Sequence, residues 1–448
     1  MNATSPAVKG KMGVLGLGRS GLAAVRFLQG SGYRVVAWDQ AKVALDGVEV
    51  WDGPCPEQQF MDCETVLLSP GIPRTHTAVA SLITHGIPVI NDCEWLYRQG
   101  QALAEPPECV AITGTNGKST VTTLVGEMLA AAGFMTQTGG NLGQAALSLW
   151  REDTRIYVLE LSSFQLESMA RFRANSAALL NISPDHMDRY PTLQHYLDAK
   201  WAIFNNQRPG DVAVINCDDP GLWPISNRVL QQGVHVVGFS IQKPLLGGVY
   251  VADGWLVDHR GAEKMPILET ARIRIKGRHN LANAAAASAL ALSRGASHAT
   301  VAHILETFPG LDHRMQWVRT VNGVTFYNDS KGTNVGAVVE SLASFDRPLV
   351  LIAGGRAKKT DFSDLRKAAD QRLRAVVLIG EAADDLEKVF QGVAPVVRAG
   401  SMVEAVTLSL QQAASGDVVL LSPACASFDM FKNFEDRGQQ FSEAVHGL

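Results

Sequence analysis

The stretch Ile112-Thr-Gly-Thr-Asn-Gly-Lys-Ser-Thr120 decides how this chain folds and what it binds. It follows the apolar run 109–111 and precedes a helical pattern over 121–132. A strand, a tight glycine loop and a helix that begins with Lys-Ser-Thr form a phosphate-binding loop, because backbone N–H groups and the helix N-terminus face the anion. Lys118 adds a positive charge, and one of the two hydroxyls that follow it is suited to hold Mg²⁺.

The spacing of this loop is not the strict P-loop spacing, which requires a glycine where Ile112 stands. The chain instead carries a shorter form, Gly114-x-x-Gly117-Lys118-Ser119. The alternative interpretation is an ordinary strand-to-helix turn that contains a lysine. We favour the phosphate-binding loop because glycine, lysine and serine all occupy the positions that phosphate binding requires.

Length and composition limit the class of protein. A chain of 448 residues predicts about three domains, and 46% hydrophobic with 19% charged residues is typical of globular proteins. The net charge of −4 gives no basic excess, which argues against nucleic acid as a partner. Six cysteines without a C-x-x-C pair argue against zinc and disulfides and favour a reducing cytoplasm. We expect no secretory signal, because the first eleven residues lack an apolar run, and no membrane span.

Strands and helices alternate along most of the chain, which predicts an α/β protein with parallel sheets. Pro106-Pro107 and Pro309-Gly310 interrupt the pattern. We therefore expect three domains, each built on a mostly parallel sheet: a Rossmann-like domain over 1–107, a P-loop-type domain over 108–309 and a Rossmann-like domain over 310–448.

Two further segments have distinct patterns. Residues 246–276 contain short apolar runs broken by glycine and aspartate, which predict a small antiparallel insert. Gly16-Leu-Gly-Arg-Ser-Gly21 follows a strand, and Asp39 ends the next one, as in the dinucleotide-binding fingerprint. The same loop accepts any diphosphate, so a nucleotide sugar fits as well as NAD. Asp39 either binds a ribose or simply ends its strand.

Acidic residues follow two strands of the central domain. Glu160 comes after the strand 156–159, beside the phosphate-binding loop, where a carboxylate is placed to bind Mg²⁺; a solvated strand-end acid is the alternative. Glu167 is expected on a helix face. His186 lies between Asp185 and Asp188 after another strand, which indicates a second metal position or a substrate contact.

Several lysine, asparagine and cysteine residues have simpler explanations as well. The helical pattern around Lys200 predicts a lysine that extends to solvent. Asn280 is explained by helix capping, whereas Asn283, one turn later, is better placed to bind a nucleotide base. In the third domain, segments 328–334, 354–359 and 422–427 follow strands, and their cationic and hydroxyl groups predict a small anionic substrate. We expect Cys425 to be a buried thiol rather than a nucleophile.

Taken together, residues 113–120, 160–167, 185–190, 328–334 and 422–438 resemble the Mur ligases, the ATP-dependent amide ligases of peptidoglycan synthesis. The resemblance extends over essentially the whole chain. It implies that the first domain holds UDP, the second ATP and the third the incoming amino acid. The implied reaction is the ligation of D-glutamate to UDP-N-acetylmuramoyl-L-alanine through an acyl phosphate. It would serve cytoplasmic precursor synthesis, and hence cell shape and division.

The resemblance also implies roles for individual residues. The catalytic residues are expected to be Lys118, Glu160, His186 and Lys200. ATP is expected to contact Gly114, Thr115, Asn116, Gly117, Lys118, Ser119, Thr120, Asn283, Arg314 and Asp329. The UDP-substrate is expected at Gly18, Arg19, Ser20, Asp39, Gly71, Asn141 and His186. D-Glutamate is expected at Thr333, Lys358, Ser427 and Phe434. Two Mg²⁺ ions are expected on Ser119, Glu160, His186 and Lys200, the last as a carbamate.

Other classes of function stay open at this point. An NAD-dependent dehydrogenase would use the first glycine loop but leaves residues 113–120 unexplained. A folate-type polyglutamate ligase shares the ATP loop, and a nucleotide-regulated binding protein would perform no chemistry. We expect small-molecule substrates and a monomer. Gln40-Ala41 stands where the family has Thr-Arg, so the uracil contacts at that corner are not predicted.

Overall fold

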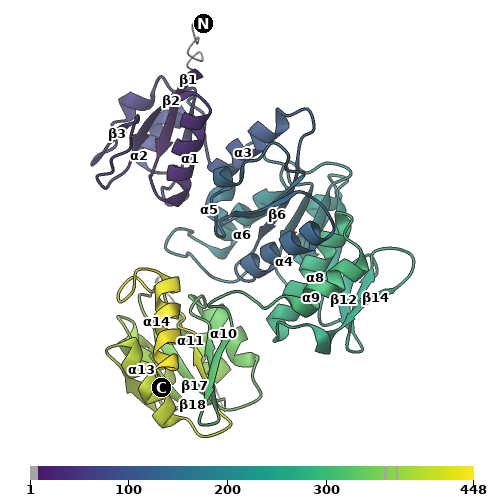
Figure 1. The fold of residues 1–448 in the computed structure, drawn as a ribbon, viewed down its shortest axis with the longest axis vertical. Coiled ribbons are helices and arrows are strands. Elements are labelled where there is room, and N and C mark those ends of the chain that lie inside the picture. The colour runs from purple at the N-terminus through teal and green to yellow at the C-terminus, as the bar shows by residue number, and fades with distance from the viewer. Residues whose placement is uncertain (1–8, 358–360, 370–371) are drawn as a thin grey trace, which may run out of the picture.

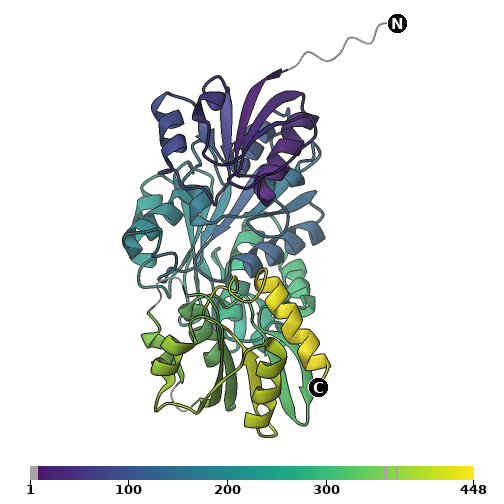
Figure 2. The same cartoon turned by 90° about the vertical axis from the view of Figure 1, so that its left-hand side faces the viewer.

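A computed structural model describes residues 9–357, 361–369 and 372–448. Three α/β units follow one another along the long axis of the molecule, with the N-terminal unit at one end and α14 in the unit at the other (Figures 1 and 2). Each unit contains one sheet, and most neighbouring strands are parallel, as the alternating pattern predicted. Within the described residues, no helix combines the length and the apolar character that crossing a bilayer requires.

The first unit contains a five-stranded parallel sheet in the order β3-β2-β1-β4-β5. Its strands are β1 (Lys9–Leu15), β2 (Tyr33–Trp38), β3 (Glu49–Trp51), β4 (Thr65–Leu68) and β5 (Val89–Ile90). Its helices are α1 (Arg19–Gly30), η1 (Glu57–Phe60) and α2 (Thr77–Thr84), followed by α3 (Asp92–Gln101).

Helix α3 is fastened to the second unit. The buried carboxylate of Glu94 accepts hydrogen bonds from the backbone N–H groups of Ala170, Arg171 and Phe172, at 2.7–3.1 Å from one oxygen. Apolar residues of both units also form one continuous core. The first two sheets therefore share packed side chains rather than being joined by a free linker.

The second unit contains a nine-stranded sheet in the order β14-β13-β12-β11-β10-β9-β6-β8-β7. Its strands are β6 (Glu108–Thr113), β7 (Thr136–Gly140), β8 (Ile156–Glu160), β9 (Ser176–Leu179), β10 (Val212–Asn216), β11 (His235–Ser240), β12 (Gly248–Ala252), β13 (Trp255–His259) and β14 (Met265–Glu269). Its helices are α4 (Lys118–Ala131), η2 (Ala146–Leu149), α5 (Ser163–Leu166), α6 (Leu193–Trp201), η3 (Ala202–Phe204), η4 (Trp223–Ile225), α7 (Asn227–Leu230), η5 (Thr270–Arg272), α8 (Arg278–Ser293) and α9 (His298–Thr307).

The antiparallel strands predicted within 246–276 are present as β12, β13 and β14. They extend the central sheet, because β12 pairs in parallel with β11. On one face of this sheet, α4 and α8 pack together in an apolar core rich in alanine. The alanines of α8 have no long side chains, so the two helices approach closely.

The third unit contains a six-stranded sheet in the order β15-β16-β20-β17-β18-β19, in which β15 is antiparallel to β16 and the other described neighbours are parallel. Its strands are β15 (Gln316–Val321), β16 (Val324–Asn328), β17 (Leu349–Gly354), β18 (Leu373–Ile379), β19 (Val396–Arg398) and β20 (Val418–Leu421). Its helices are α10 (Val335–Ala343), α11 (Ser363–Ala369), α12 (Ala383–Phe390), α13 (Met402–Gln412) and α14 (Phe434–His446).

Candidate functional site

The glycine loop between β6 and α4 has the backbone that its sequence predicts. Gly114 and Gly117 adopt φ values of +154° and +83°, which side-chain-bearing residues rarely adopt. A Cβ atom on Gly117 would also lie 2.3 Å from the amide oxygen of Asn283 on α8. The ammonium of Lys118 donates to the carbonyl oxygens of Gly114 at 2.8 Å and Thr115 at 2.7 Å, so the lysine lies against its own loop.

The carboxylate of Glu160 lies beside this loop at the end of β8, and the residue is only 2% exposed. It accepts hydrogen bonds from the Ser119 hydroxyl at 2.5 Å and from the Asn141 amide at 2.7 Å. Burial raises the pKa of Glu160, but the charges of Lys118 and Arg314 and these two hydrogen bonds together bring it below the usual value. The buried carboxylate is therefore ionised at neutral pH and is not the solvated acid of the alternative interpretation.

Arg314 connects this cluster to the third unit. Its guanidinium donates a 2.7 Å hydrogen bond to the Ser119 hydroxyl. Nearby, the buried carboxyl of Asp329 accepts hydrogen bonds from Ser341 at 2.7 Å and Ser422 at 2.8 Å. Burial raises the pKa of Asp329 to about 6 despite these hydrogen bonds.

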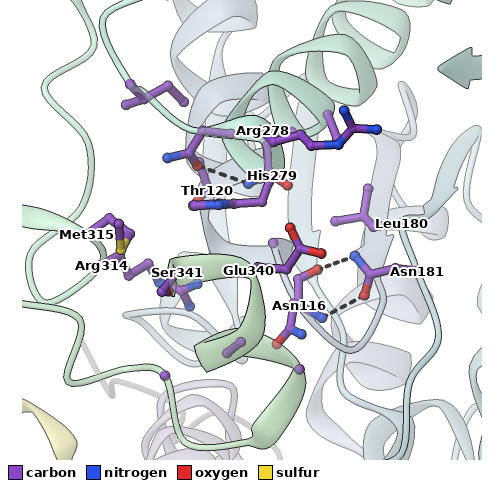
Figure 3. Close-up of a pocket in the computed structure, with 18 of the residues that line it drawn as sticks. Asn116, Thr120, Leu180, Asn181, Arg278, His279, Arg314, Met315, Glu340 and Ser341 are labelled. Atoms are coloured by element: carbon purple, nitrogen blue, oxygen red, sulfur yellow. Dashed lines mark hydrogen bonds between the residues drawn. The ribbon is translucent and has the colours of Figure 1, made fainter. Parts of the chain in front are cut away.

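A cavity of about 380 Å³ lies between the second and third units, and we call it the first cavity. Figure 3 shows residues of the lining from different elements, among them Asn116 of the glycine loop, Arg278 and His279 at the start of α8, and Glu340 of α10. The predicted ATP contacts that line the cavity come from both units: Asn116, Gly117, Thr120, Asn283, Arg314 and Asp329. Lys331 lines it as well, although it was not among the predicted contacts.

A second cavity of about 230 Å³ lies on the other side of the glycine loop. Lys118 lines this cavity, whereas Gly117 and Thr120 line the first, so the loop separates the two spaces. The residues around the second cavity are Pro70, Gly71, Lys118, Asn141, Ser162, Ser163, Phe164, His186, Tyr196 and Lys200. The predicted substrate contacts Gly71, Asn141 and His186 therefore do lie together.

Lys200 does not extend to solvent, so that part of the sequence prediction is wrong. The residue is 1% exposed, and its ammonium nitrogen lies 2.8 Å from the carbonyl oxygen of Gly114 and 4.5 Å from the centre of the Tyr196 ring. Burial, together with the charge of Lys118, holds the pKa of Lys200 well below its usual range. The side chain points inward because α6 packs that face against the loop rather than exposing it.

His186 presents its ring to the second cavity from a left-handed backbone conformation, φ +57°. Its ring packs against that of Phe164, with centroids 4.8 Å apart, and its Nε2 lies 3.6 Å from Asp185. Glu167 was expected on a helix face. It instead follows the four-residue helix α5 and accepts hydrogen bonds from Arg189 at 2.7 Å and Tyr190 at 2.5 Å.

The first unit contributes a second glycine loop. Gly18 precedes α1, and Arg19 and Ser20 begin that helix. The carboxylate of Asp39 accepts hydrogen bonds from the backbone N–H of Leu17 at 2.6 Å and Ala41 at 2.9 Å, so Asp39 fixes the loop itself. Arg19 donates at 3.1 Å to the carbonyl oxygen of Asn141 in the second unit, which brings this loop to the second cavity.

The predicted amino-acid contacts are only partly described, because Lys358 lies outside the described residues. Ser427 is buried after β20, and Phe434 begins α14. The ammonium of Lys331 lies 3.7 Å from the centre of the Phe434 ring. Thr333 follows two residues later, on the same loop as Lys331, before α10. Cys425 is 1% exposed, as predicted for a buried thiol.

Sequence reasoning missed several residues of these cavities. Lys331 lies inside the segment 328–334 that was singled out, so its charge was the available signal. Phe164 and Tyr196 gave no such signal in the sequence, because an aromatic residue in a helix is usually part of a core. Arg437 lines neither cavity, but it is fully buried and donates to the carbonyl oxygens of Ser330 at 2.8 Å and Cys425 at 3.1 Å, which its place in a polar helix did not indicate.

Known proteins share both the sequence and the fold of this chain. Three family models match: the Mur ligase MurD-like N-terminal domain over residues 10–91, the Mur ligase middle domain over 112–291 and the Mur ligase glutamate ligase domain over 313–425. A UDP-N-acetylmuramoylalanine–D-glutamate ligase from Methylococcus capsulatus is 40% identical, over 98% of this chain and 95% of its own. The enzyme of that name from Methylobacillus flagellatus is 42% identical, over 97% and 96%.

Two solved structures have a fold similar to that of this chain. MurF from Acinetobacter baumannii superimposes with a TM-score of 0.63 at 17% identity, over 98% of this chain and 94% of its own. UDP-N-acetylmuramate–alanine ligase MurC from Thermotoga maritima gives 0.61 at 18% identity, over 98% and 99%. The sequence matches extend over nearly the whole chain, and the glycine loop lies where the middle-domain match begins. The chain belongs to the Mur ligase family.

Proposed function

We propose that this protein ligates D-glutamate to UDP-N-acetylmuramoyl-L-alanine with the energy of ATP. The relatives at 40–42% identity bear the name of that ligase. The structural observation that carries the proposal is the position of the glycine loop between two cavities, with Lys118 facing the second. A nucleotide in the first cavity would then have its terminal phosphate beside Lys118, next to an acceptor in the second.

The reaction would proceed in two steps. A carboxylate oxygen of the acceptor attacks the γ-phosphorus of ATP, the bond to the β-phosphate oxygen breaks, and ADP leaves. The amine of D-glutamate then attacks the acyl carbon, and the resulting tetrahedral intermediate expels phosphate while the nitrogen loses a proton. Lys118 neutralises negative charge during the transfer, and the cavities orient both reactants. This division of labour explains why no residue of the chain is needed as a nucleophile.

The residues beside the loop fit a Mg²⁺ ion. Glu160 is a buried, ionised carboxylate, and the Ser119 hydroxyl lies 2.5 Å from it, so two oxygen donors of the type that Mg²⁺ prefers are side by side. The described residues contain no group of three His, Cys, Asp or Glu side chains that would form a metal site alone. We therefore infer that Ser119 and Glu160 bind the ion jointly with phosphate oxygens. The ion would offset the charge of the transferring phosphoryl group.

A second Mg²⁺ position would lie toward His186 and Lys200. Burial and the charge of Lys118 hold the pKa of Lys200 well below its usual range, which favours the neutral amine, the form that reacts with CO₂ to give a carbamate. A carbamate would convert a buried nitrogen into a pair of anionic oxygens beside Lys118. We propose that Lys200 acts in this modified form and that His186 contributes to the same position.

The remaining substrate contacts follow from the arrangement of the units. We propose that Gly18, Arg19, Ser20 and Gly71 hold the UDP-substrate, and that Asp39 acts by fixing the loop 16–18. D-Glutamate would contact the third unit at Thr333, Lys358, Ser427 and Phe434. The nucleotide would lie against Asn283, Arg314 and Asp329.

The test is amino-acid-dependent release of ADP by the purified protein. We expect ADP only when UDP-N-acetylmuramoyl-L-alanine and D-glutamate are both present, and none when L-glutamate or another D-amino acid replaces D-glutamate. Turnover with a folate acceptor would favour the polyglutamate ligase instead. Binding of NAD without any consumption of ATP would favour the dehydrogenase, and nucleotide binding without ADP release would favour a regulatory role.

A further inference from the structure

The turn that follows His186 presents that residue to the second cavity. The backbone N–H groups of Arg189 and Tyr190 both donate to the carbonyl oxygen of His186, at 2.9 Å and 3.0 Å. His186 itself has a φ of +57°, a conformation that is uncommon for residues other than glycine. The orientation of the His186 ring therefore depends on how this turn is anchored to the rest of the protein.

Arg189 provides that anchor through three contacts. Its guanidinium donates to Glu167 at 2.7 Å and to the carbonyl oxygen of Pro70 at 3.3 Å, and its central carbon lies 3.9 Å from the centre of the Phe164 ring. Pro70 belongs to the first unit, whereas Phe164 and Glu167 belong to the second. One planar side chain thus joins the turn to two other segments, one of them in a different unit.

Each of the three joined segments contributes to the second cavity. Gly71 follows Pro70, Phe164 lies on α5, and His186 begins the turn, and all three line the cavity. Arg189 itself is not among the lining residues, so it acts through its neighbours. The hydroxyl of Tyr190 also donates a 2.5 Å hydrogen bond to Glu167, and this bond holds the carboxylate that pairs with Arg189 in place.

We propose that Arg189 is a positioning residue that sets the width and the orientation of the second cavity, and with them the affinity for the acceptor substrate. The identity of that substrate rests on the proposed function. The role of Arg189 in connecting Pro70, Phe164 and His186 is independent of that function. The Arg189–Glu167 pair is partly buried, with side-chain exposures of 18% and 23%, so it is less screened than a surface pair.

The substitution Arg189→Lys separates positioning from charge. A lysine ammonium can still pair with Glu167, but it lacks the planar fork that reaches Pro70 while stacking on Phe164. We expect KM for UDP-N-acetylmuramoyl-L-alanine to rise by about tenfold or more, because small displacements in a site have large kinetic effects. We expect KM for ATP to stay within about twofold, since the first cavity is not touched. Glu167→Gln should act in the same direction, and its effect should not add to that of Arg189→Lys.

The matched control is Arg173→Lys. Arg173 forms an equally close ion pair with the buried Asp211, at 2.7 Å and 2.6 Å, in the same unit, and neither residue lines the first or the second cavity. A purely structural role for Arg189 would make both variants alike, with a lower melting temperature and unchanged KM values. An unchanged KM for the acceptor in Arg189→Lys would overturn the proposal.

Hydrogen exchange of the ligand-free protein gives a readout that does not depend on the substrate. We expect faster exchange of backbone amides over 69–72 and 186–190 in Arg189→Lys, and wild-type rates there in Arg173→Lys. Wild-type exchange in both segments would overturn the role of Arg189 even if the protein is an active ligase. Faster exchange in a protein without ligase activity would support that role and reject the proposed function alone.

Discussion

The hydroxyl of Ser119 donates a 2.5 Å hydrogen bond to the carboxylate of Glu160, and this pair is the centre of a chain of contacts through all three units. On one side, Asn141 donates to Glu160 at 2.7 Å, and Arg19 of the first unit donates to the carbonyl oxygen of Asn141. On the other side, Arg314 donates to Ser119 at 2.7 Å. The phosphate-binding loop is thus connected to the units that are proposed to hold the other two substrates.

Lys118→Ala should lower kcat by about 10²–10³-fold without unfolding the protein. The ammonium lies at the loop between the cavities, and removal of one charged group that stabilises a transition state typically costs about 10²–10³-fold in kcat. ADP release measures the loss, and thermal melting measures the fold. Lys388→Ala is the control, because Lys388 forms an exposed ion pair on α12 and should affect neither. Normal product formation by Lys118→Ala would remove the loop from the mechanism.

Glu160→Gln should raise the Mg²⁺ concentration needed for half-maximal activity by about 10–100-fold. The amide has the same size as the carboxylate but no charge with which to hold the ion. Glu108→Gln is the control, since Glu108 lies on the neighbouring strand β6 and pairs with Arg294 instead. Mg²⁺ titrations of ADP release compare the two variants, and an equal requirement in both would show that Glu160 does not bind the ion.

Lys200 should carry a carbamate when CO₂ is present. Its pKa is held well below the usual range by burial and by Lys118, which raises the share of neutral amine that can react with CO₂. Protein equilibrated with ¹³C-bicarbonate should give a carbamate carbon signal by NMR that is absent from Lys200→Arg, whose guanidinium keeps its proton. Removal of CO₂ should lower activity, and bicarbonate should restore it. The same carbon signal in both proteins would place the carbamate elsewhere.

Lys331 should make the use of ATP sensitive to alkaline pH. Burial, and then the charge of Arg314, lowers its pKa to about 8, so the ammonium is charged below pH 8 and neutral above it. Because a triphosphate is attracted by the charged form, kcat/KM for ATP should be constant below about pH 8 and should fall above it. In Lys331→Arg the charge persists, and the decline should disappear. A profile with the same alkaline decline in both proteins would assign it to another group.

Much of this site could be predicted from the sequence because parallel sheets bring the carboxyl ends of their strands to one edge. Residues after β6, β8 and β9 meet at the glycine loop, although 46 or more residues separate Thr113 from Glu160 and Asn181 along the chain. Gly114 and Gly117 adopt positive φ values, which suit glycine, and their spacing to Lys118 indicated a phosphate-binding site. These features are local, so a single sequence suffices to identify them.

The parts that could not be predicted depend on tertiary contacts. The helical pattern around Lys200 is compatible with a lysine in solvent, and only the packing of α6 against the Gly114 carbonyl decides otherwise. Strand β7, Thr136–Gly140, is polar and rich in glycine, so its sequence does not indicate a strand. The contact of Lys331 with Phe434 joins a loop to a distant helix. No local sequence pattern indicates a contact between residues so far apart in the chain.

The most direct test of the central claim is a crystal structure of the protein with Mg²⁺ and a non-hydrolysable ATP analogue. We expect the nucleoside to lie in the first cavity and the terminal phosphate to lie beside Lys118 and the Ser119–Glu160 pair, facing the second cavity. A nucleotide bound elsewhere, with the loop over residues 114–118 making no contact to phosphate, would contradict this expectation.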